Sequence, residues 1–333
     1  MKSFIKNQSG KAGMFIVFSI GVISFLAVFQ TFFIDLNPGQ GNISFSVAQA
    51  ASSTVTASTT VIVGNASPIV TAVTLNNGGT ITLTPNATTA ISVAATITDY
   101  NGCTDITGGT STILVYRSGI TSSTCLTTAN DQNCYIATTF TASSSCSAGT
   151  QNVTSTFGIY YFADSTNGAS SSYSSQTWMA TVIFKDPTNA TGSADSSGVE
   201  LNVLTALNVT TSSINYGTVP ANTNTGSTNQ LATSTNAGNS TTTLKISAIS
   251  TLTNGSNSIS TSSQHYATSS FTYGGVEQLL QETATDVSGS TMAIPTSTTD
   301  VTKTTYWGLA VPPATATGTY TGVNLFTSAW SSS

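Results

Sequence analysis

Short runs of alternating apolar and polar residues, separated by turn residues, constrain the fold of this chain more than any other feature. Between residues 68 and 204 such runs recur at 69–75, 80–83, 90–98, 112–116, 135–140, 153–162, 177–184 and 199–204. A period of two places successive side chains on opposite faces of a strand. Short strands at this spacing predict an all-β sandwich over residues 68–204, with Trp178 anchoring its core.

Residues 205–333 repeat the all-β pattern and predict a second β-sandwich domain, with the boundary near Thr205. The candidate strands are residues 214–217, 243–249, 271–273, 306–311 and 320–326, followed by a strand-like tail at 323–330. Residues 277–282 (EQLLQE) are the one stretch that suits a short helical turn.

The N-terminal segment, residues 1–50, predicts a signal peptide or a membrane anchor. Residues 14–34 carry no charge and follow Lys2, Lys6 and Lys11. An apolar helix of this length can cross a hydrocarbon core of ~30 Å, with the lysines staying inside and the rest of the chain outside. The whole chain after this export or anchor helix is therefore expected at the cell surface or in the medium.

Three interpretations of this segment remain open. Ala48-Gln49-Ala50 fits a signal-peptidase site, whereas the length of the apolar run favours an uncleaved anchor through residues 14–34. Lys11-Ala12-Gly13 before Met14 resembles a type IV prepilin processing site, although Phe18 stands where that family carries a glutamate. Residues 51–67, which include the β-type stretch 60–63, then predict a linker, or else a free strand that completes a neighbour's sheet.

Charge excludes nucleic acid as a partner. Beyond residue 50 the chain has four basic and eleven acidic side chains, so a basic footprint for phosphates is missing. Charged residues make up 6% of the chain and Ser and Thr roughly a third. The 14 Phe and 11 Tyr residues nevertheless favour folded β domains over a disordered stalk.

Four cysteines lie close together in the sequence: Cys103, Cys125, Cys134 and Cys146. They form no CxxC pair and have no histidine nearby, which disfavours zinc. An even number in an exported chain predicts two disulfides, with three possible pairings, and free thiols are the alternative. The bridges are expected to stabilise an irregular excursion from the sandwich.

Two kinds of binding site are suggested by local patterns. Asp99, Asn101 and Asp105 place three oxygen-bearing side chains in one loop, which predicts a structural calcium, although Cys103 favours a plain disulfide-linked turn. No other cofactor is expected. Tyr160, Tyr161, Tyr306 and Trp307 are candidates for stacking on a glycan, with core packing as the alternative. Alternation places Tyr160 and Phe162 on one face and Tyr161 on the other.

No catalytic constellation stands out in the sequence. His265 is the only histidine, in a polar stretch, and is interpreted as an exposed loop residue. The sequence contains no G-x-S-x-G elbow, and twelve scattered acids give no specific carboxylate pair. We therefore expect a protein that is not an enzyme.

The segments SINYGTVPANT, STNAGNSTTTLKIS and YWGLAVPPATATGTYTG resemble bacterial extracellular immunoglobulin-like modules, with Asn236-Ala237-Gly238-Asn239 and Gly318-Thr319-Tyr320 at the matching positions. DYNGC, YFAD, GVELN and INYG also resemble uncharacterised secreted Ser/Thr-rich surface proteins of small-genome bacteria. These resemblances imply two tandem sandwiches and no catalytic residue.

The expected function is that of a cell-surface structural or adhesive protein, extracellular or tethered by its N-terminus. Its expected partners are surface polysaccharide, other surface proteins or further copies of itself. The alternatives are a carbohydrate-binding module or receptor of the cell envelope, and a subunit of an extracellular filament.

Overall fold

The computed structural model describes residues 31–35, 44–48, 57–168 and 171–331. Residues 64–333 form one compact unit, which is distinct from residues 1–63. The elements of the larger unit are almost all β-strands, with two short α-helices and two 3-10 turns among the described residues. The predicted all-β class is therefore confirmed.

In the smaller unit, β1 (Thr31–Asp35) and β2 (Ser44–Ala48) pair as an antiparallel hairpin. The structure differs here from the predicted apolar helix, because residues 31–34 belong to a strand. Threonine, phenylalanine and isoleucine all suit strands. Residues 14–30, which make up the rest of that helix, and residues 49–50 of the cleavage motif lie outside the described residues. Within the part of the chain that is described, no helix is both long and apolar enough to cross a bilayer.

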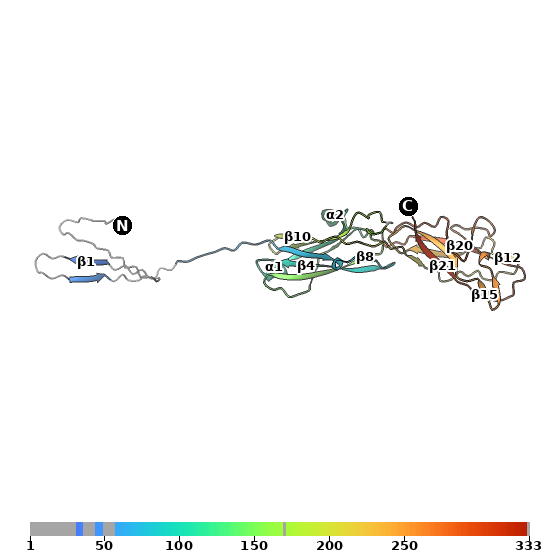
Figure 1. The fold of residues 1–333 in the computed structure, drawn as a ribbon, viewed down its shortest axis with the longest axis horizontal. Coiled ribbons are helices and arrows are strands. Elements are labelled where there is room, and N and C mark those ends of the chain that lie inside the picture. The colour runs from blue at the N-terminus through green and yellow to red at the C-terminus, as the bar shows by residue number, and fades with distance from the viewer. Residues whose placement is uncertain (1–30, 36–43, 49–56, 169–170, 332–333) are drawn as a thin grey trace. The chain divides into compact units, whose positions relative to one another are not determined.

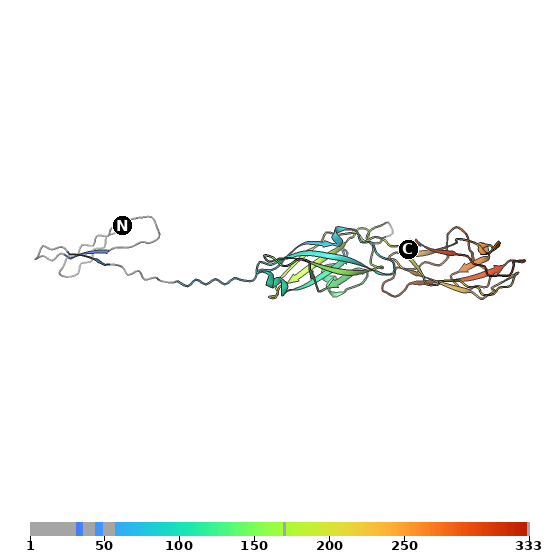
Figure 2. The ribbon, with the colours of Figure 1, turned by 90° about the horizontal axis from the view of Figure 1, so that it is seen from below.

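The first sandwich consists of two four-stranded antiparallel sheets, which lie one over the other in Figures 1 and 2. One sheet has the order β3-β4-β8-β7 and the other β10-β9-β5-β6. These strands are β3 (Ile69–Leu75), β4 (Thr88–Thr98), β5 (Thr110–Arg117), β6 (Cys134–Ala137), β7 (Thr141–Ala142), β8 (Thr150–Tyr160), β9 (Trp178–Lys185) and β10 (Thr191–Asp195).

The predicted alternation produces the core between these sheets. β4 buries Ile91, Val93, Ala95 and Ile97 and leaves the residues between them partly exposed. From the opposite sheet, Trp178 is fully buried, as predicted, and donates its indole N–H to the carbonyl oxygen of Asp164 at 2.8 Å. Each fully buried large apolar side chain contributes on the order of 2 kcal/mol, so this shared core holds the two sheets together.

The second sandwich is built from a larger sheet and a three-stranded sheet. The larger sheet has the order β11-β13-β20-β17-β18, with β12 also paired to β20, and the smaller one has the order β19-β14-β21. These strands are β11 (Leu207–Val209), β12 (Thr223–Asn224), β13 (Gln230–Asn236), β14 (Thr242–Ala248), β17 (Gln264–Ala267), β18 (Gln278–Leu279), β19 (Thr285–Asp286), β20 (Thr302–Val311) and β21 (Asn324–Trp330).

The core of the second sandwich centres on Trp307 and Tyr266, both fully buried, which pack against Leu244 and Ile246 of the opposite sheet. A separate hairpin of β15 (Leu252–Asn254) and β16 (Asn257–Ile259) covers a smaller apolar cluster. The pairings of strands β3 to β21 lie within either residues 69–195 or residues 207–330, and Thr205 lies between these two ranges.

Two helices, α1 (Cys103–Thr107) and α2 (Ser122–Thr127), interrupt the first sandwich in the cysteine-containing region, which matches the predicted irregular excursion. The 3-10 turns are η1 (Asn76–Gly78) and η2 (Thr261–Ser263).

Several predicted elements differ from the structure. Residues 80–83 and 199–204 form only isolated bridges, such as Ile81 with Leu201, and residues 214–217 and 271–273 contain no strand. The predicted helical turn at 277–282 is wrong, because β18 in that stretch pairs with β17 and Leu280 is buried in the core. Tertiary pairing has overridden the local helical preference.

Candidate functional sites

The joint between the two sandwiches is built around the turn between β13 and β14. Asn239 in this turn is 2% exposed and connects three backbone groups of the first sandwich and the boundary. Its Oδ1 accepts from the Leu204 N–H at 2.6 Å, and its Nδ2 donates to the carbonyl oxygens of Ala163 at 2.9 Å and Asn202 at 3.2 Å. Buried polar groups that are fully paired in this way favour one unique arrangement.

Backbone contacts strengthen the same joint. The Asn86 N–H donates to the Ala237 carbonyl oxygen at 3.1 Å, and the Asn239 N–H donates to the Leu204 carbonyl oxygen at 2.9 Å. Gly238 lies so close to the Leu204 carbonyl that a side chain would overlap it. The NAGN motif, which the sequence indicates only as a turn between strands, therefore clamps the two sandwiches together.

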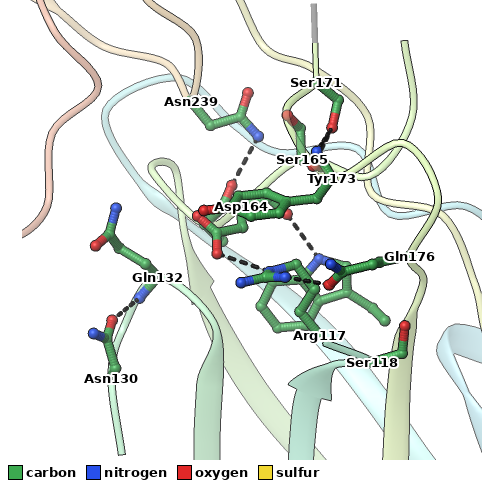
Figure 3. Close-up of polar contacts among 12 residues, drawn as sticks. Arg117, Ser118, Asn130, Gln132, Asp164, Ser165, Ser171, Tyr173, Gln176 and Asn239 are labelled. Carbon is green, nitrogen blue, oxygen red and sulfur yellow. Dashed lines mark hydrogen bonds and ion pairs between the residues drawn. The ribbon is translucent and has the colours of Figure 1, made fainter. Parts of the chain in front are cut away.

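A buried ion pair lies beside this joint, as Figure 3 shows. Arg117, at the end of β5, donates from Nε to Asp164 Oδ2 at 2.9 Å and is only 6% exposed. Its guanidinium stacks 3.6 Å from the ring centroid of Tyr173 and also bonds to the side chain of Gln176. Burial raises the pKa of Asp164, and the neighbouring guanidinium opposes part of that shift. No local sequence pattern indicates this network, because its members lie far apart in the chain.

The four cysteines form two disulfides, as predicted, and the structure selects one of the three pairings. Cys103 pairs with Cys146, a sequence separation of 43, and we call this bond the long-loop disulfide. Cys125 pairs with Cys134, a separation of 9, and this is the short-loop disulfide. The first joins α1 to the approach to β8, and the second joins α2 to the start of β6.

A cluster of three carboxylates includes two of the predicted calcium ligands. One oxygen each from Asp99, Asp105 and Asp186 lies within 4.8 Å of the others. Asp99 and Asp186 are 1% and 3% exposed, and no ion pair among the described residues neutralises any of the three. Asp99 Oδ2 is buried with no hydrogen-bond partner. Asp186 was missed by the sequence analysis, because it follows β9, far along the chain from Asp99.

The third predicted ligand, Asn101, has a different role in the structure. Its Oδ1 accepts from the Ala66 N–H at 2.6 Å, and its Nδ2 donates to the Gly64 carbonyl oxygen at 3.3 Å. Asn65 Nδ2 donates to Asp186 Oδ2 at 2.7 Å. Burial raises the pKa of Asp186, but the hydrogen bond from Asn65 and those from Thr188 and Ala190 hold it below its ordinary value overall. Residues 64–66 are thus attached to the rim of the acidic cluster.

The predicted glycan-contact residues are mostly buried. Tyr161 is 4% exposed and Trp307 is fully buried, so neither presents a ring face to a sugar. Tyr160 is half-buried and stacks on Phe162 with ring centroids 5.1 Å apart, and Tyr306 is also half-buried. β8 ends at Tyr160, and in the turn that follows it Tyr161 and Phe162 are both buried.

His265 is not an exposed loop residue, contrary to the sequence interpretation. It lies on β17, its side chain is 14% exposed, and its Nδ1 is 2.9 Å from Glu277 Oε1. Its ring stacks on Tyr273 with centroids 4.2 Å apart. Burial raises the pKa of Glu277, but hydrogen bonds from His265 and the Gly274 N–H bring it below its ordinary value.

Neither a protein-family model nor a curated protein matches the chain. Among solved structures, dimeric latent PorU from Porphyromonas gingivalis resembles it with a TM-score of 0.24 and 12% identity, over 86% of this chain and 25% of that chain. The chain therefore spans about a quarter of the length of that protein. A likeness at this level carries no argument about fold or function.

Proposed function

We propose that this chain is a non-enzymatic structural or adhesive protein of the cell surface, built from two immunoglobulin-like sandwiches. The observation that carries the proposal is the buried joint around Asn239, where two sandwiches are clamped by hydrogen bonds instead of being joined by a flexible linker. A clamped pair of sandwiches transmits force along the chain and holds its outer loops at a set distance.

The strand order supports the immunoglobulin-like assignment. In such sandwiches the order is A-B-E-D in one sheet, and C, F and G lie side by side in the other. Numbered along the chain, β3-β4-β8-β7 reproduces A-B-E-D, and β5-β9-β10 reproduces C-F-G with β6 at its edge. The second sandwich repeats the central pairings B-E and C-F as β13-β20 and β14-β21. Its strands β17 and β19, which take the places of β7 and β6, follow in the opposite chain order.

The two disulfides support a location outside the cytoplasm, because such bonds form and persist in oxidising compartments. Both bridges tie the irregular helices of the first sandwich to its strands. They stabilise the part of that domain with the least regular hydrogen bonding, which suits a protein exposed to stress outside the cell.

We also propose that the acidic cluster binds a structural calcium ion. Calcium prefers six to eight oxygen ligands, and three carboxylates that face one another supply part of such a shell. The specific observation is Asp99 Oδ2, a buried carboxylate oxygen without any partner. Leaving a buried charge unpaired is costly, and a bound cation removes that cost. Because Asn65 contacts Asp186, the ion would also stabilise the attachment of residues 64–66.

The proposed surface role is tested by locating the protein on intact cells and by examining cells that lack it. Immunogold labelling of intact cells, together with N-terminal sequencing of the recovered protein, is expected to place residues 64–333 outside the membrane and to identify any cleavage. A strain lacking the protein should then lose attachment or envelope integrity. Labelling that requires permeabilised cells would refute the proposal.

A matched binding experiment tests the adhesive part. Recovered protein should bind cells, surface polysaccharide or further copies of itself, and Asn239→Ala should weaken the effect by loosening the joint, while the exposed Asn208→Ala should not. Binding of none of these three would remove the adhesive role. A glycan array that detects discrete sugars would instead favour the carbohydrate-binding alternative.

A further inference from the structure

In space, the second sandwich repeats most of the strand arrangement of the first, with β12 and β18 added and one strand lacking among those described. The set β3-β4-β8-β7 corresponds to β11-β13-β20-β17, and β6-β5-β9 corresponds to β19-β14-β21. In the first sandwich, β10 then lies beside β9 and against the start of β3, where Gly192 has no room for a side chain next to Pro68. Among the described strands, none takes this place beside β21.

The missing strand leaves β21 uncovered. In β9, its counterpart, Trp178, Ala180 and Val182 are fully buried. No residue of β21 is buried, and Leu325 and Trp330 are 42% and 49% exposed. Exposed apolar side chains on an unpaired strand edge form a template for a further strand.

A cavity of about 1060 Å³ lies at the same place. Its lining includes Asn324 and Phe326 of β21, residues 315–323 before them, and residues 211–221, which follow β11. This is the position between the counterparts of β9 and β3, where β10 closes the first sandwich. Leu309 and Val311 contribute apolar surface to the cavity. Two polar atoms of its lining, Asn324 Oδ1 and Gln264 Nε2, are buried without hydrogen-bond partners.

Residues 57–63 have the properties of the absent strand. They belong to no described strand or helix, and Val61, Ile62 and Val63 are 81%, 90% and 80% exposed. Three consecutive β-branched residues favour an extended strand. In a strand, Val61 and Val63 share one face, whereas Thr60 and Ile62 share the other.

The segment cannot fill the cavity of its own chain. β4 spans the first sandwich from the joint, where Asn86 contacts Ala237, to the opposite end, where Asn101 contacts Ala66. Its 11 residues cover about 36 Å at ~3.3 Å each. Seven residues starting from Gly64 reach at most ~25 Å, and the cavity lies beyond the joint. Residues 57–63 can therefore reach such a cavity only in another molecule.

We propose that residues 57–63 of one copy add as a strand beside β21 of a second copy, in the place that β10 takes beside β9, with Val61 and Val63 directed into the cavity. The main chain of the donor pairs with the free edge of β21, and its valines share the face of Asn324 and Phe326, which line the cavity. The inference deepens the proposed structural role and rests on it, because it names the partner as a second copy of this chain.

Such a contact joins different surfaces of the two molecules, namely residues 57–63 of one and the second sandwich of the other. A contact of this head-to-tail kind does not close on itself unless the rotation between copies forms a ring, and it otherwise generates an open filament. Each added copy presents an unoccupied cavity beside its own β21, so the filament continues to grow at that end.

The test uses the full chain recovered from cells, examined by negative-stain electron microscopy and size-exclusion chromatography. The wild-type protein is expected to form head-to-tail polymers. Val61→Asp with Val63→Asp should reduce the protein to monomers, because it places charge inside the cavity. The control, Ile62→Asp, changes a neighbour on the opposite face and should leave polymers intact. Circular dichroism should show the same β content in all three proteins, because residues 61–63 are exposed.

A synthetic peptide of residues 54–66 provides a second readout. Added in excess, it should occupy the cavities beside β21 and shorten the polymers. The same peptide with Val61 and Val63 changed to aspartate should have no effect. Polymers that persist in the double variant, or a wild-type protein that stays monomeric at every concentration, would overturn the proposal. Surface labelling distinguishes this failure from failure of the proposed function. Monomers found on the cell surface would refute strand donation but leave the surface role standing.

Discussion

Replacing Asn239 by alanine tests whether the joint is the structural centre of the molecule. The change removes three hydrogen bonds and leaves the buried Leu204 N–H without its side-chain acceptor. A typical intramolecular hydrogen bond contributes about 1 kcal/mol, and a buried group left unpaired costs about 1–3 kcal/mol. We therefore expect Asn239→Ala to lower the free energy of unfolding by about 2–4 kcal/mol.

The measurement is thermal and urea unfolding followed by circular dichroism, with limited proteolysis at residues 203–207. The loss corresponds to a fall in melting temperature of about 5–10 °C for a domain of ordinary size. We also expect the single transition to split, because the two cores are then no longer coupled. The matched control, Asn208→Ala, removes an exposed asparagine and should change the stability by less than about 0.5 kcal/mol. Equal effects of the two substitutions would refute the reasoning.

Three further predictions concern the disulfides, acid stability and calcium. Replacing both cysteines of the long-loop disulfide by serine should lower the free energy of unfolding in urea by about 4 kcal/mol, and the same change in the short-loop disulfide should lower it by about 2.5 kcal/mol. The reason is that a longer closed loop removes more entropy from the unfolded chain. A larger loss from the short-loop disulfide would contradict this. The pKa of Glu277 is lower in the folded state, so its stabilising contribution is complete above its unfolded pKa of about 4.3 and is lost as the pH falls through the folded value. Glu277→Gln should therefore flatten the acid limb of a melting-temperature profile, and an unchanged limb would count against this assignment. Calcium at about 1 mM should raise the melting temperature of the wild type and of the control Asp131→Asn, an exposed residue, but not that of Asp186→Asn. If calcium gave no heat in calorimetry and a chelator left the melting temperature unchanged, the calcium site would be refuted.

Local sequence patterns were sufficient for the fold class and for the long strands. β4 and β8 each extend over 11 residues with regular alternation, and both lie where the period of two predicts them. Short elements were less predictable, since their state depends on tertiary partners. β18 is a strand only because it pairs with β17, although its own sequence favours a helical turn.

The candidate sites depended on contacts that no local pattern encodes. Asp186 joins Asp99 only because the end of β9 and the end of β4 meet at one end of the first sandwich. His265 also looked exposed in its polar stretch, and only the approach of Glu277 and Tyr273 covers it. The sequence predicts a linker or a free strand at residues 51–67, whereas the acceptor that we propose for residues 57–63 depends on the sheet order around β21, which no local pattern encodes.

The way in which the other sheet edges are protected supports strand donation. Natural sheets avoid uncontrolled pairing by short, bulged or charged edge strands. β7, β18 and β19 have only two residues each, and β3 is interrupted by a bulge between Thr71 and Thr74. β10 carries a glycine and ends in Asp195. β21 has none of these features: its sequence NLFTSAW contains no charge, proline or glycine over seven residues. Charged side chains, which make up only 6% of the chain, do not protect the edge of β21 either. An unprotected edge is explained if a strand of another copy covers it in the assembled state. Introducing Ala329→Lys on β21, opposite the partly exposed Thr243, should then disrupt polymers without lowering the melting temperature of the monomer, and intact polymers in that variant would show that the edge stays free.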